Sequence, residues 1–167
     1  MKKKLIYLGL IFLALLVQLS FLPALINPGA MGDAVLMLVL AIAVLDGFAP
    51  ALNWAIVAGL LYDFASFGLP GQYVIIFLLL VYAVSFFSRR LSVEVKGIWI
   101  FLLFLFVITA MLISKSLLIL FFMSSGQSVN FLQALGGFKN FVFQAGCNMV
   151  LFFFWFNAVR KVKRILL

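Results

Sequence analysis

The stretch AMGDAVLMLVLAIAVLDGFAPALNWAIVAGLLYDFASF, residues 30–67, decides the fold. It contains two apolar runs on either side of the turn-forming residues Asp46 to Pro50. An α-helix rises about 1.5 Å per residue, so a membrane-spanning helix needs roughly 17–25 residues. The stretch is too long for one span and slightly short for two. Its length therefore leaves one kinked helix and two short helices both open.

The lysines and arginines outside this stretch decide between the two interpretations. Ten of the twelve lie in three clusters between apolar runs: Lys2, Lys3 and Lys4; Arg89, Arg90 and Lys96; and Arg160, Lys161, Lys163 and Arg164. Basic clusters of this kind stay on the cytoplasmic side of a membrane. An even number of spans must then separate Lys4 from Arg89, so the stretch contributes two.

The sequence therefore predicts an all-α, polytopic membrane protein with one integral membrane domain, residues 1–167. We expect a six-transmembrane-helix bundle in the bacterial cytoplasmic (inner) membrane, with the N- and C-termini cytoplasmic. The approximate spans are residues 5–22, 32–46, 50–67, 72–88, 97–122 and 138–159. Pro23 is expected to end the first span, because proline disrupts a helix interior.

Composition supports a membrane protein and excludes several function classes. The chain is 68% hydrophobic and 10% charged, whereas soluble domains are roughly 45–50% apolar and about 25% charged. Membrane lipid is therefore its expected surroundings. The net charge of +8 is clustered between spans, so nucleic-acid binding is not expected. Histidine is absent and Cys147 is the single cysteine, which excludes a histidine-containing zinc site, a Ser-His triad and a disulfide framework. We expect no catalytic residue, no cofactor and no metal.

Aspartates supply the candidate structural and interaction residues. Asp63 lies near the outer end of the third span, where ionisable groups are costly and usually face protein or water. It is either a catalytic or ligand-binding carboxylate or an acceptor for backbone N–H groups of the following loop, together with Ser66. That loop includes Gly71 and cannot continue a helix. Asp33 and Asp46 flank the second span, where we expect each to be an interfacial cap rather than a site, and Asp33 occupies the position of an N-cap.

Small residues recur at four-residue spacing along one face of the third span. They are Ala51, Ala55 and Gly59. Such rows let neighbouring membrane helices approach closely, so we expect this face to pack on another helix. Short spans of this composition favour tight packing over exposure to lipid.

Two other function classes fit parts of the pattern. An intramembrane aspartyl protease needs two carboxylates that share a proton, and Asp33 and Asp63 are both expected on the outer side. Lipoprotein signal peptidases, which have a similar length, carry asparagines in the motifs around both aspartates. Here none of the asparagines is in register with an aspartate: Asn53, Asn148 and Asn157. A substrate-binding subunit of an energy-coupling-factor type transporter is also small, six-span and basic inside. It would need several polar groups around one cavity, and few intramembrane polar residues are available.

The segment between residues 32 and 91 resembles the family of the rod shape-determining protein MreD. The similar features are Gly32-Asp33 before a short apolar span, Gly59 to Ser66, Gly68-Leu69-Pro70-Gly71, and a span through Tyr82 that closes with Arg89-Arg90-Leu91. The chain departs from the family at Asp46-Gly47, where the family commonly has a basic residue.

The resemblance implies a non-catalytic scaffold of the bacterial cell-elongation machinery, which builds peptidoglycan and determines rod shape. It implies that the chain binds the bitopic protein MreC. It further implies association, through MreC, with the RodA glycosyltransferase, a class B penicillin-binding transpeptidase and, indirectly, the MreB filament.

Overall fold

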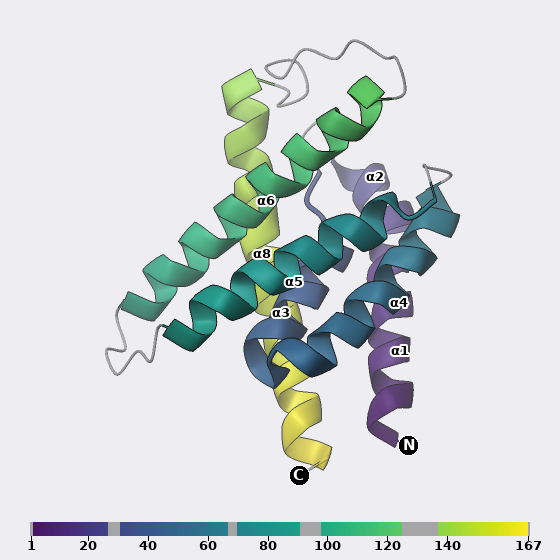
Figure 1. The fold of residues 1–167 in the computed structure, drawn as a ribbon, viewed down its shortest axis with the longest axis vertical. Helices are drawn as coiled ribbons and strands as arrows, with labels where there is room; N and C mark the ends of the chain where they lie inside the picture. Colours follow the sequence, from purple (N-terminus) through teal and green to yellow (C-terminus); the bar gives the residue numbers. More distant parts are fainter. Residues whose placement is uncertain (1, 27–30, 67–69, 91–97, 125–136, 167) are drawn as a thin grey trace.

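The computed structural model describes residues 2–26, 31–66, 70–90, 98–124 and 137–166 (Figure 1). All regular secondary structure in these ranges is helical, so the predicted all-α class is confirmed. The elements are α1 (Lys2–Leu16), the π-helical segment η1 (Val17–Phe21), α2 (Leu22–Leu25), α3 (Ala34–Asp46), α4 (Phe48–Ser66), α5 (Gln72–Arg90), α6 (Ile98–Ser124) and α8 (Gly137–Leu166).

The long helices run in alternating directions, and both ends of the chain lie at the same end of the bundle (Figure 1). Within the described ranges, three helical segments are long and apolar enough to cross a membrane, and three shorter helical segments are also strongly apolar. The long ones are Lys3–Leu25, Phe48–Ser66 and Lys139–Ile165. The shorter ones are Ala34–Asp46, Gln72–Phe86 and Val107–Leu117.

The first helix continues past Pro23, which corrects the predicted end at Leu22. The Leu22 N–H donates to the Val17 carbonyl, five residues back, which is the wider hydrogen-bonding pattern of a π-helix. Pro23 then lies in the first turn of α2, where its missing N–H interrupts no hydrogen bond. Helical structure therefore extends to Leu25, and Ile26 is extended.

Helix α3 forms the centre of the molecule. Its first ten residues, Ala34 to Ala43, are all buried, and it packs against α8, α4, α5 and α1. At 13 residues it is only about 20 Å long. Protein rather than lipid surrounds it, as the short apolar span suggested.

A single residue, Gly47, joins α3 to α4. Its φ of 83° is a backbone conformation that favours glycine, and its N–H donates to the Ala43 carbonyl at 3.2 Å. The junction is shorter than the predicted turn from Asp46 to Pro50, because Pro50 fits within the first turn of α4.

The later helices lie close to the predicted spans but extend beyond several of their ends. Helix α5 reaches Arg90 rather than residue 88, α6 reaches Ser124 rather than 122, and α8 reaches Leu166 rather than 159. The basic residues after the last span therefore continue its helix.

Candidate functional site

The Asp63 carboxylate holds the turn between α4 and α5. Its Oδ2 accepts a hydrogen bond from the Gly71 N–H and its Oδ1 accepts one from the Tyr73 N–H, both at 2.9 Å. Gly71 has a φ of 88° and immediately precedes α5, so the carboxylate satisfies unpaired N–H groups at the start of that helix. A negative charge there is also favourable to the helix dipole. The predicted contact between Asp63 and the following backbone is present.

Ser66 does not take part in this arrangement, contrary to the expected contact. Its buried hydroxyl has no hydrogen-bond partner within the described ranges. Gly68 and Leu69 of the predicted turn motif, together with the side chains of Arg89 and Arg90, lie outside the described residues.

The row of small residues on α4 faces the protein interior. Ala51, Ala55 and Gly59 are all buried. A Cβ atom added at Gly59 would lie 2.6 Å from the Cα of Val74 and 2.8 Å from its backbone nitrogen. Helices α4 and α5 therefore cross in backbone contact at Gly59. Edge-to-face packing of Tyr62 on Tyr73, with ring centroids 4.2 Å apart, extends the same interface.

A second group of polar side chains ties three helices together near the start of α3. The Gln18 Oε1 accepts from the Ala34 N–H at 2.6 Å, and the Asn148 Oδ1 accepts from the Asp33 N–H at 2.7 Å. Asp33 itself caps α3, since its Oδ1 accepts from the Leu36 N–H at 2.9 Å. All of these N–H groups belong to the N-terminus of α3, so each contact satisfies a group that the helix leaves unpaired.

Gln18 was not among the residues predicted from the sequence, and Asn148 was predicted to have no role. Both are buried in long apolar helices, and this placement is the signal that could have identified them, because a polar side chain within a span usually has a specific partner. Gly32 lies against the same part of α8: an added Cβ would be 2.8 Å from the Asn148 Oδ1. The residue before Asp33 must therefore be small.

Asp46 anchors the other end of the bundle, which goes beyond the interfacial cap expected from its sequence position. Its Oδ2 accepts from the Tyr7 hydroxyl at 2.7 Å and lies 3.1 Å from the Lys3 Nζ, and its Oδ1 lies 3.2 Å from the Lys163 Nζ. Lys163 also donates to the Leu45 carbonyl at 2.6 Å. The carboxylate side chain is only 3% exposed. It joins α1 and α8 to the end of α3.

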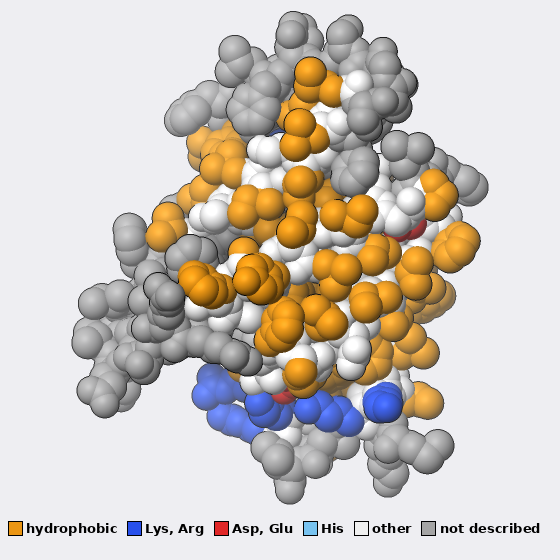
Figure 2. Space-filling model, in the orientation of Figure 1, with side chains coloured by type: hydrophobic (Ala, Val, Ile, Leu, Met, Phe, Trp, Pro, Cys, Tyr) orange, Lys and Arg blue, Asp and Glu red, His pale blue; other side chains and the backbone are white. Residues whose placement is uncertain are grey.

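Basic side chains gather around this anchor. Figure 2 shows them as a blue band across the end of the molecule that holds both termini, below a surface that is mostly apolar. The described basic residues at this end are Lys3, Lys4, Arg160, Lys161, Lys163 and Arg164. Asp46 balances one of these charges, so this end carries a strong positive potential.

All three aspartates in the described ranges are engaged in holding helices in place. Asp33 and Asp63 bind backbone N–H groups, and Asp46 binds two lysines and a tyrosine. Within those ranges no three histidine, cysteine or acidic side chains come together as a metal site would require. In each case the carboxylate holds the end of a helix in position.

Comparison with known proteins identifies a family. The family model of the rod shape-determining protein MreD matches residues 2–162, nearly the whole chain. No curated protein and no solved structure matches significantly. The match extends well beyond the segment between residues 32 and 91 on which the sequence resemblance rests.

Proposed function

Because the chain belongs to the MreD family of rod shape-determining proteins, we propose that it is a non-catalytic membrane scaffold of the bacterial cell-elongation machinery. Its proposed direct partner is MreC. Through MreC it associates with RodA, with a class B penicillin-binding transpeptidase and indirectly with MreB filaments. A role in rod shape determination follows from the family itself.

One observation supports a scaffold over an enzyme. The aspartates Asp33 and Asp63, which an aspartyl protease would need free to activate water, accept backbone hydrogen bonds at 2.9 Å. These bonds hold each carboxylate in a fixed orientation against the N-terminus of a helix. Both aspartates therefore have a role in holding backbone, whereas an aspartyl protease uses two carboxylates that share a proton.

We propose a six-span topology with both termini in the cytoplasm. Two features support it. The helices alternate in direction (Figure 1), and the basic band surrounds the end that holds both termini (Figure 2), where the positive-inside rule places it in the cytoplasm. The shortness of α3 is compatible with this proposal, since a helix enclosed by protein does not need to match the bilayer thickness by itself.

Replacement in a rod-shaped host tests the scaffold proposal. The chain, with an affinity tag, replaces the host's own MreD, and cell shape is scored while detergent-solubilised complexes are recovered. We expect rod-shaped cells and recovery of MreC, and rounded cells when the chain is depleted. Normal rods on depletion, or recovery of an ATPase module with its coupling subunit in place of MreC, would contradict the proposal.

The variant Asp33→Asn separates scaffold from protease in the same host. Asparagine keeps one acceptor oxygen for the Leu36 N–H but cannot act as an acid or base. We expect the variant to reach the membrane at a normal level and to support rod shape. A variant that is abundant and still binds MreC, but that fails to maintain rod shape, would favour an enzyme.

A further inference from the structure

A groove of about 690 Å³ opens between α1 and the first turns of α4, at the end of the bundle that holds the termini. Lys3 and Lys4 line its α1 side, Pro50 and Trp54 line its α4 side, and Asp46 also lines it. This volume is within the range of small-molecule sites, roughly 300–1,000 Å³. It belongs to neither the Asp63 turn nor the Gln18 and Asn148 contacts.

The groove has a charged end and an apolar end. The lysines lie in the first turn of α1, and Tyr7 follows one turn further along the same helix. On α4, Pro50, Trp54 and Val57 share one face at helical spacing. These residues extend over about two turns, so the apolar wall runs about 10 Å along the helix away from the lysines.

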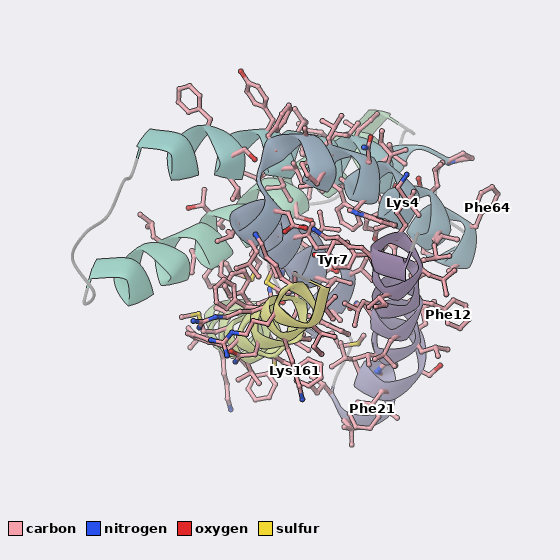
Figure 3. All side chains as sticks on the ribbon, turned by 90° about the horizontal axis from the view of Figure 1, so that it is seen from below. Lys4, Tyr7, Phe12, Phe21, Phe64 and Lys161 are labelled. Carbon is pink, nitrogen blue, oxygen red and sulfur yellow. The ribbon has the colours of Figure 1, made fainter. Side chains whose placement is uncertain are left out.

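A net positive charge remains at this end of the groove, because two lysines share the single Asp46 carboxylate. The Asp46 side chain is 3% exposed and is already bound by Lys3, Lys163 and Tyr7, so its negative charge is largely compensated. Lys4 has no ion-pair partner within the described ranges, and its side chain is exposed. Figure 3, which views this end of the bundle, has Lys4 beside α4 and Lys161 on α8.

From this combination we propose that the groove binds one anionic phospholipid. Lys4 and Lys3 hold the headgroup phosphate, Asn53 lines the polar end of the groove, and an acyl chain lies along Trp54 and Val57. The order of contacts matches a lipid in a leaflet, with charge at the surface and hydrocarbon inward. The edge-to-face pair of Tyr7 and Trp54, with centroids 5.5 Å apart, joins the α1 and α4 sides of the groove. A free anion would use the lysines but would leave the apolar wall uncovered.

The proposal depends on the chain lying in a bilayer and does not depend on the scaffold function. It can therefore be tested on the purified protein alone. The full chain is placed in nanodiscs of zwitterionic lipid that contain increasing fractions of phosphatidylglycerol with brominated acyl chains. Bromine quenches tryptophan on contact, and the Trp54 signal is taken as the difference between the wild type and Trp54→Phe.

Lys4→Gln and Lys161→Gln are matched variants, because both remove one exposed lysine from the same end and only Lys4 lines the groove. We expect brominated phosphatidylglycerol to quench Trp54 at lower fractions than brominated phosphatidylcholine. Lys4→Gln should raise the required fraction by about fivefold, the effect of one lysine near a membrane surface. Lys161→Gln should leave it nearly unchanged.

Three results would overturn the proposal. Equal quenching by both lipids would mean that the groove accepts any acyl chain. An equal effect of the two lysine variants would reduce the site to general attraction of anionic lipid by the basic end. Relief of quenching by millimolar inorganic phosphate would assign the lysines to a free anion. Ala49→Phe, which places a large side chain without tryptophan fluorescence at the exposed groove wall, should abolish the lipid preference without loss of folded protein.

Discussion

Removal of the Asp63 carboxylate tests whether this residue is architectural. In Asp63→Ala the Gly71 and Tyr73 N–H groups both lose their acceptor. Each such group left unpaired away from water costs about 1–3 kcal/mol. Both residues are partly exposed, so some water reaches them and we take the lower part of the range, a total loss of about 2–4 kcal/mol. For a chain of this size that corresponds to a fall in Tm of about 5–15 °C.

Two further variants make the measurement specific. Asp63→Asn keeps one acceptor oxygen but points an amide N–H₂ at the second donor, so it should lose about half as much stability. Ser66→Ala, one turn further along α4, removes a hydroxyl that has no partner within the described ranges and should leave Tm unchanged. Thermal unfolding in detergent, followed by circular dichroism, measures all three.

The result that refutes this account is an Asp63→Ala protein with the Tm of the wild type. A second refutation would come from cells. Asp63→Asn present at full level in the membrane, with complete loss of rod shape, would mean that the carboxylate acts in function rather than in folding.

Three other contacts give predictions of the same kind. Gly59→Ala forces a Cβ into the backbone of α5 and should lower Tm by an amount equivalent to about 1–3 kcal/mol, whereas Gly9→Ala, with open space around it, should not lower it. Gln18→Leu leaves the Ala34 N–H unpaired at the buried start of α3 and should therefore lower Tm. A Tm equal to that of the wild type would mean that water replaces the lost side-chain acceptor. Asp46→Asn should speed hydrogen exchange in the first turns of α1 and the last turns of α8, measured by mass spectrometry, and should leave the α4–α5 turn unchanged.

Local features of the fold could be predicted from the sequence because their causes are local. Asp33 precedes an apolar run by one residue and caps it. Asp63 precedes residues that cannot continue a helix, and its carboxylate satisfies the backbone that follows. The small residues of α4 mark its buried face through helical spacing alone. Each of these inferences needs knowledge of no more than about ten consecutive residues.

The remaining contacts depend on how the helices are rotated and packed. Asp46 meets Lys163 across 117 positions of sequence, and Asn148 meets the Asp33 backbone across 115. No periodicity within one helix indicates which distant helix faces it. Pro23 shows a different limit of prediction from sequence. A proline is expected to end an α-helix, but here the π-helical turn before it lets the helix continue to Leu25.

The enclosure of α3 has a consequence for biogenesis. The helix is flanked on one side by α8, which the ribosome completes about 120 residues after the end of α3, roughly 6–24 s at ordinary elongation rates. During that interval the nascent chain contains α3 without the Asn148 side-chain oxygen that accepts from the Asp33 N–H. The earlier helices are therefore made before the helix that covers this side of α3 exists, and the α3–α8 interface forms only after α8 has been synthesised.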